Sequence, residues 1–214
     1  MGNNYPYGHC PRPEMLKFIP KQAMRILEVG CGDGAFCQTM KNQNFEREIW
    51  GLELNGDVAE KAKNLCDKVL VGDFNDLYHD LPENYFDCIV FNDVLEHLLE
   101  PWNVIKDCKS LLSETGILVS SLPNFQYIHN LIEVFWHGKF QYKEQGILDI
   151  THLRFFTKKS IRSFYEENGY KILIHRGINP KLYWKTYFLT ILSFGKLKDV
   201  KYAQFATVAK PIKM

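Results

Sequence analysis

The 214-residue sequence contains no hydrophobic run long enough to cross a membrane, no excess of one charge and no paired-cysteine motif. A spanning helix needs about 20 apolar residues in a row. The net charge is only +1, so electrostatics do not favour nucleic acid as a partner. An N-P-P-[YF] type motif, typical of methylases that act on nucleic acids, is also absent. The six cysteines show no C-x-x-C pair, so we interpret them as thiols in a reducing compartment. Because the N-terminal stretch also lacks an apolar signal region, we expect a cytoplasmic protein with no transmembrane segment and no nucleic-acid partner.

Strand-like and helix-like patterns alternate along most of the chain. Strands are predicted at 25–29, 48–54, 68–71, 86–91 and 117–121. Helices are predicted from Ala35, over 57–66, from Pro101 to an exit at Gly116, and over 157–168. This alternation is typical of a doubly wound α/β fold, a mostly parallel sheet with helices on both faces.

The alternation breaks between residues 123 and 156. We interpret this segment as an acceptor-side insertion, with an amphipathic helix over 125–142 that acts as a lid or as a dimer contact. Residues 1–24 are a lead-in, and the whole range 1–214 is predicted to form a single domain. The apolar stretch 182–194 is expected to pack against the core, with assembly, a greasy acceptor or a membrane surface as alternatives.

The first predicted strand runs directly into a glycine-rich turn, Glu28-Val29-Gly30-Cys31-Gly32-Asp33-Gly34. The N-terminal N–H groups of the following helix point back at this turn and favour an anionic or polar ligand. The turn fits both the G-x-G-x-x-G/A pattern of dinucleotide-binding proteins and the E-x-G-x-G-x-G pattern of S-adenosylmethionine (SAM) methyltransferases. The turn alone therefore leaves NAD(P) and SAM open.

Polar residues follow the predicted strands at their carboxyl ends, where open α/β sheets bind ligands. Glu53 ends the second strand, and a carboxylate there can accept hydrogen bonds from both ribose hydroxyls in either cofactor class. Asp73 is placed to accept from an adenine amino group, and the backbone N–H of Phe74 could contact the ring. This acid after the third strand favours SAM.

With these residues the chain resembles the class I, seven-stranded SAM-dependent methyltransferases. Five segments in order carry the resemblance: ILEVGCGDG, GLEL (51–54), VGDF (71–74), FDCIVFNDVLEHL (86–98) and LLSETGILVSSLPN (111–124). More narrowly, the segments 92–97, 121–124 and 146–157 resemble bacterial methyltransferases of glycan-biosynthesis and similar small-molecule pathways. The resemblance implies that 170–175 and 202–210 form a hairpin in which the last strand of the sheet is antiparallel.

The resemblance also implies SAM as cofactor, S-adenosylhomocysteine (SAH) as product and no metal. The cofactor-binding residues it implies are Glu28, Gly30, Cys31, Gly32, Gly34, Glu53, Leu54, Asp73, Phe74, Asn92, Asp93, Val94 and His97. His97 is also a candidate base, although in this motif the histidine more often shapes the cofactor pocket.

His152 is the stronger candidate for a general base, because it closes the insertion that would face the acceptor. Asp149 could orient its imidazole and Arg154 could hold an anionic acceptor, while a loop-fixing hydrogen-bond network is an equal alternative. The predicted substrate-binding residues are Asn124, Tyr127, His152 and Arg154.

The sequence thus predicts methyl transfer from SAM to a small-molecule acceptor, most simply an oxygen of a sugar or related metabolite. Two alternatives remain open: an NAD(P)-dependent oxidoreductase and a non-catalytic SAM-binding module. A homodimer is compatible with the aromatic segments.

Overall fold

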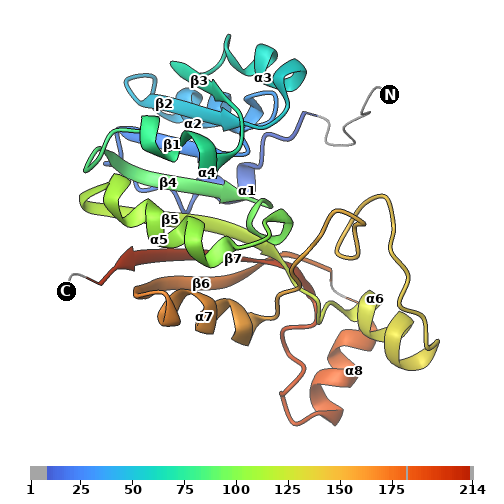
Figure 1. Cartoon of the computed structure of the whole chain (residues 1–214). Coiled ribbons are helices and arrows are strands. Elements are labelled where there is room, and N and C mark those ends of the chain that lie inside the picture. The colour runs from blue at the N-terminus through green and yellow to red at the C-terminus, as the bar shows by residue number, and fades with distance from the viewer. Residues whose placement is uncertain (1–8, 182, 213–214) are drawn as a thin grey trace.

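A seven-stranded sheet forms the centre of the molecule, with strand order β3-β2-β1-β4-β5-β7-β6. The computed structural model describes residues 9–181 and 183–212. β7 pairs antiparallel with both β5 and β6, whereas all other pairings are parallel. The predicted mostly parallel sheet with an antiparallel last strand is therefore confirmed (Figure 1). The strands are β1 (Arg25–Val29), β2 (Glu48–Glu53), β3 (Lys68–Val71), β4 (Phe86–Asn92), β5 (Leu112–Pro123), β6 (Tyr170–Pro180) and β7 (Tyr202–Pro211).

Helices cover both faces of this sheet, as predicted for a doubly wound fold. Helices α4, α5 and α7 lie on one face and α1, α2 and α3 on the other (Figure 1). The side chains of the two groups belong to two separate core clusters. The helices are α1 (Pro13–Leu16), α2 (Ala35–Gln43), α3 (Gly56–Ala62), α4 (Phe74–Leu77), α5 (Pro101–Leu111), α6 (Ile128–Leu131), α7 (Lys158–Glu167) and α8 (Trp184–Leu192). Short 3₁₀ turns lie at η1 (Tyr78–Asp80) and η2 (Leu95–His97), and a π-helical turn at η3 (Ile132–Trp136).

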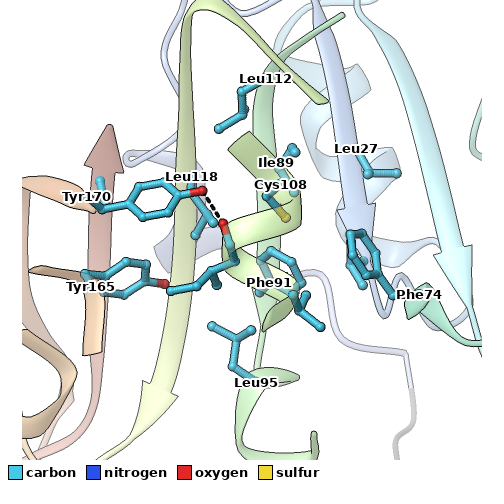
Figure 2. Packing of buried hydrophobic residues seen from close by; sticks show 14 of the residues in the cluster. Leu27, Phe74, Ile89, Phe91, Leu95, Cys108, Leu112, Leu118, Tyr165 and Tyr170 are labelled. Atoms are coloured by element: carbon cyan, nitrogen blue, oxygen red, sulfur yellow. Dashed lines mark hydrogen bonds between the residues drawn. The ribbon is translucent and has the colours of Figure 1, made fainter. Parts of the chain in front are cut away.

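The core on the α5 and α7 face is closed by two buried tyrosines (Figure 2). The Tyr170 hydroxyl donates to the Ile105 carbonyl at 2.5 Å, and the Tyr165 hydroxyl donates to Ser120 Oγ at 2.7 Å. Their rings bury apolar area while each hydroxyl keeps a partner, which avoids the cost of an unpaired buried polar group. β4 and β5 therefore rest on a tightly packed layer, and this fixes the residues at their carboxyl ends.

Local sequence signals set most helix ends. Thr157 and Ser160 form a capping box at the start of α7, and Gly169 follows the helix with φ +76°, as its role of stop residue requires. Gly116 was expected at a helix exit, and this is wrong: the chain passes from α5 directly into β5 at Leu112. A Cβ at Gly116 would lie 2.7 Å from the Phe86 carbonyl oxygen, so close backbone approach explains the glycine.

Residues 124–156 together with α8 form a side lobe beyond the end of β5 (Figure 1). The helix expected over 125–142 is wrong in extent, because α6 and η3 end at Trp136 and the chain then runs irregularly. Tyr127, Ile128 and Val200 form a small buried cluster that holds the lobe to the segment before β7. The expectation that 182–194 packs against the core is also wrong, since several of its large side chains lie in solvent. The most exposed are Trp184, Ile191 and Phe194.

No helix among the described residues combines the length and apolar content that a membrane span requires.

Candidate cofactor and acceptor site

The glycine turn lies at the carboxyl end of β1, and its three glycines all have positive φ: +72° at Gly30, +55° at Gly32 and +83° at Gly34. L side chains rarely adopt this region. A Cβ at Gly30 would lie 2.4 Å from Val94 Cγ2, and one at Gly34 would lie 3.0 Å from the α-carbon of Ala62. At Gly32 a Cβ would meet no protein atom within 4 Å. Packing thus requires glycine at two positions, and Gly32 is the position that faces open space.

Glu53 supports this open position from the end of β2. Its carboxylate is buried, with Oε2 accepting from the Gly32 N–H at 2.9 Å and Oε1 accepting from the Asn55 N–H at 2.9 Å. An ionised carboxylate has about four lone-pair sites, so each oxygen retains capacity for another donor such as a ribose hydroxyl. The neighbouring Leu54 side chain is exposed and can cover one side of a bound nucleoside.

At the carboxyl end of β3, backbone groups rather than side chains face the site. Asp73 caps α4 by accepting from the Asn75 N–H at 2.8 Å. The Phe74 ring is buried in the core against Phe91, which fixes its backbone N–H beside Asp73. Cys31 turns its thiol beneath the glycine turn toward Gly51. Cys31 and Phe74 can therefore contact a cofactor only through their main chains.

Glu28 lies under the turn rather than in the open site. Its Oε1 accepts from Asn92 Nδ2 at 3.1 Å and its Oε2 from the Cys37 thiol at 3.1 Å. Burial raises the pKa of Glu28 to about 8, an effect that these two hydrogen bonds oppose. Asn92 Oδ1 has no hydrogen-bond partner among the described residues, so it is available to accept from a cofactor. Glu28 thus acts by orienting Asn92.

A network that the sequence analysis missed ties the lead-in to this edge of the sheet. The Arg12 guanidinium pairs with the Asp93 carboxylate and donates to Ser121 Oγ at 2.9 Å. Asp93 has φ +56° and also accepts from Ser121 Oγ at 2.9 Å and Gln204 Nε2 at 2.8 Å. The arginine and its carboxylate are 81 residues apart in sequence, and no periodic pattern or motif marks Arg12.

Glu96, His97 and His152 meet beside this network. The backbone carbonyl of Glu96 accepts from the N–H groups of Leu153 and Arg154, both at 2.9 Å, which holds the last residues of the 124–156 segment against η2. The His97 and His152 rings consequently pack edge to face with centroids 4.6 Å apart. The structure therefore brings the two predicted catalytic histidines together, and it adds a buried acid that was not predicted.

Asp149 has a different role from the predicted one. The Nδ1 of His152 contacts the Ile147 carbonyl at 3.0 Å, so a backbone group and not Asp149 orients that nitrogen. Asp149 Oδ1 instead accepts from the Thr151 hydroxyl at 2.6 Å, and that hydroxyl lies 3.0 Å from Nδ1 of His97. Burial, followed by the neighbouring His152, lowers the pKa of His97. The acid thus positions His97 through Thr151.

The other predicted substrate-binding residues are engaged within the protein. Asn124 is buried, and its amide donates to the Tyr202 carbonyl at 2.9 Å, so its contact with the acceptor stays a prediction. The Tyr127 ring is buried in the cluster of the side lobe, whereas its hydroxyl has no hydrogen-bond partner among the described residues, so its contact with the acceptor also stays a prediction. Arg154 donates to the Leu99 carbonyl and lies 5.2 Å from the Trp102 ring centroid, contacts typical of a structural arginine.

Comparisons with known proteins agree with this architecture. A family model described as a methyltransferase domain matches residues 9–175. The ubiquinone biosynthesis O-methyltransferase of Glaesserella parasuis is 29% identical over 130 residues, covering 54% of each chain. That of Coxiella burnetii is 24% identical over 184 residues, covering 80% of this chain and 75% of its own.

The chain spans about half the length of the first of these relatives. Among solved structures, a SAM-dependent methyltransferase from Archaeoglobus fulgidus superposes with a TM-score of 0.67 at 19% identity, covering 92% of this chain and 91% of its own. The family match includes the glycine turn, Glu53, Asp73 and the paired histidines. The chain therefore belongs to the methyltransferase-domain family and has the fold of the class I SAM-dependent methyltransferases.

Proposed function

We propose that this protein transfers a methyl group from SAM to a hydroxyl oxygen of a small-molecule acceptor. The observation that carries the proposal is the adjacency of two sites at one edge of the sheet. The open position at Gly32, supported by Glu53, suits the nucleoside and methionine parts of SAM. Asn92 and Asp93 lead from that position to the histidine cluster through η2.

Methyl transfer from a sulfonium is an in-line displacement, so the protein has to align the acceptor oxygen with the methyl carbon and remove the hydroxyl proton. His152 is buried, and its Nδ1 contacts a backbone carbonyl. That contact sets the tautomer in which Nε2 carries the lone pair. Nε2 lies in the cluster, 4.0 Å from Glu96 Oε1, and we propose that this nitrogen takes part in activating the bound hydroxyl.

The relatives' printed name supports oxygen as the accepting atom. It gives no support for a sugar, so our proposal is a hydroxyl compound. The side lobe continues directly from the end of β5, and we propose that it covers the acceptor. The rings of Phe125, Phe140 and Phe155 pack together in this lobe, and such an aromatic cluster favours an acceptor with an apolar part.

A mass-spectrometric screen of hydroxylated metabolites for a SAM-dependent gain of one CH₂ unit tests this function. Once an acceptor is found, the His152→Ala variant should lose about 10²–10⁴ in turnover and keep its SAH affinity. His137→Ala is the matched control, because His137 is exposed in the same lobe. Undiminished turnover by His152→Ala would remove the histidine from the chemistry. SAH binding with no methylated product in any pool would favour the non-catalytic SAM-binding module.

A further inference from the structure

We propose that Glu96, His97 and His152 bind a divalent transition-metal ion, and that the acceptor hydroxyl occupies an open position on that ion. One potential ligand atom from each residue lies within 4.8 Å of the others. The role of the ion toward the acceptor rests on the proposed function, whereas the binding site itself does not. This proposal replaces the expectation that no metal is used.

The first argument is the state of Glu96. Its side chain is 1% exposed, and neither carboxylate oxygen has a hydrogen-bond partner among the described residues. An ionised carboxylate in such surroundings costs several kcal/mol unless a cation compensates it. Protonation would leave a buried hydroxyl and a buried carbonyl that still lack partners. A bound cation satisfies the group completely.

The second argument is the orientation of His152. Its Nδ1 contacts the Ile147 carbonyl at 3.0 Å, and a carbonyl only accepts, so Nδ1 carries the proton and Nε2 carries the lone pair. This Nε2 lies 4.0 Å from Glu96 Oε1. Two acceptors therefore face each other. Two bonds of about 2.1 Å, as in a Zn²⁺-like site, bridge this separation at a wide angle, and a small approach of the two side chains brings it to the tetrahedral value.

The third argument is the set of groups behind the ligands. The Thr151 hydroxyl donates to Asp149 at 2.6 Å, so toward His97 Nδ1, 3.0 Å away, it can only accept. This fixes the proton of His97 on Nδ1 and directs the basicity of the ring to Nε2. Metal-binding histidines characteristically donate their second N–H to a carboxylate, a backbone carbonyl or water, and His97 Nδ1 also lies 3.3 Å from the Thr151 carbonyl. Both histidines of this cluster have such a partner.

Two imidazoles and one carboxylate match the ligand preference of Zn²⁺, Fe²⁺ or Mn²⁺ better than that of Ca²⁺ or Mg²⁺, which favour oxygen ligands. Three protein ligands also leave a position for an exogenous oxygen. A hydroxyl bound there has its pKa lowered by the ion, so it can release its proton to water. The resulting oxyanion then forms a bond to the methyl carbon of SAM while the carbon–sulfur bond breaks, and SAH leaves. In this arrangement His152 is a ligand, and the ion activates the hydroxyl in its place.

The rival arrangement is a protonated His152 that forms an ion pair with Glu96 and excludes a cation. Titration of the chelator-treated full chain with Co²⁺ distinguishes the two, read by visible absorption and by calorimetry. We expect one equivalent of Co²⁺ to bind, with absorption bands of a nitrogen- and oxygen-ligated ion that Zn²⁺ displaces. Glu96→Gln and His152→Ala should each weaken Co²⁺ binding at least tenfold, whereas the control His137→Ala should bind as the unaltered chain does.

SAH binding is measured for every variant. A variant that binds SAH is folded, and because SAH binding does not depend on the proposed ion, this measurement separates the two proposals. A chain that binds SAH but shows no saturable Co²⁺ signal overturns the metal site and leaves the methyltransferase proposal standing. Equal Co²⁺ affinity in Glu96→Gln and the unaltered chain also overturns it. A chain that binds Co²⁺ but not SAH would instead contradict the proposed function alone.

Discussion

Replacing Glu53 with glutamine removes the charge of the residue that supports the open position of the glycine turn. The carboxylate accepts from the Gly32 and Asn55 N–H groups, one on each oxygen. Glutamine has one acceptor oxygen, so its NH₂ group must face one of these two N–H donors. The variant loses one charge-assisted bond to the backbone and one acceptor for a ribose hydroxyl. Hydrogen bonds to charged groups contribute about 1.5–3 kcal/mol each.

We expect a loss of about 2 kcal/mol in SAH binding, which corresponds to an affinity about 30-fold lower. Isothermal titration calorimetry with SAH measures this loss directly. Thermal unfolding of the SAH-free variant shows whether the substitution also destabilises the glycine turn. Glu60→Gln is the control, because Glu60 is an exposed acid whose partner is Lys63 on the same surface. If Glu53→Gln binds SAH as tightly as Glu60→Gln, Glu53 does not contact the cofactor and the assignment of the site is refuted.

Three further predictions concern the surroundings of the site. Gly30→Ala should lower the free energy of unfolding by about 1–3 kcal/mol, because its Cβ would lie 2.4 Å from Val94 Cγ2 at φ +72°. Urea titration checks this, and the double variant with Val94→Ala should recover part of the loss. Glu28→Gln should flatten the pH dependence of stability. Burial raises the folded-state pKa of Glu28 from 4.5 to about 8, so its contribution is complete below the lower value and is lost as pH rises to the upper one. At alkaline pH the variant should therefore resist urea better than the unaltered chain, and an unchanged profile would contradict the pKa shift. Arg12→Ala should cost about 1–3 kcal/mol because it deprives the Asp93 carboxylate of its cationic partner. A double-mutant cycle with Asp93→Asn that gives no coupling would show that this pair is not formed in solution.

Much of the fold could be predicted because its signals are local. The apolar strand before Gly30, Pro101 at the first turn of α5 and Thr157 before α7 each act within a few residues of their position. Gly116 was misassigned for the same reason: its cause is the Phe86 carbonyl, which comes near only once β4 and β5 pair.

The candidate site was less predictable because long-range contacts decide it. Sequence position placed His97 and His152 on the correct side of the sheet, but their packing depends on backbone hydrogen bonds between Glu96 and the last residues of the 124–156 segment. Arg12 reaches Asp93 across the sheet edge, and no spacing rule connects the two. In the sequence, Glu96 is only one residue of a motif. The structure makes it a candidate ligand because both of its buried carboxylate oxygens lack a hydrogen-bond partner among the described residues. Asn124 was predicted as a substrate-binding residue, but in the structure its amide donates to the Tyr202 carbonyl, a contact that the sequence does not reveal.

Calorimetric titration of the full chain with SAH, and separately with NADH, tests the central claim most directly. We propose that the ribose lies at Glu53, the methionine part at the glycine turn and the ammonium group near Asn92 Oδ1, which has no hydrogen-bond partner among the described residues. This placement predicts one SAH site of roughly micromolar affinity, weakened by Glu53→Gln, and no comparable binding of NADH. Binding of NADH without binding of SAH would contradict it.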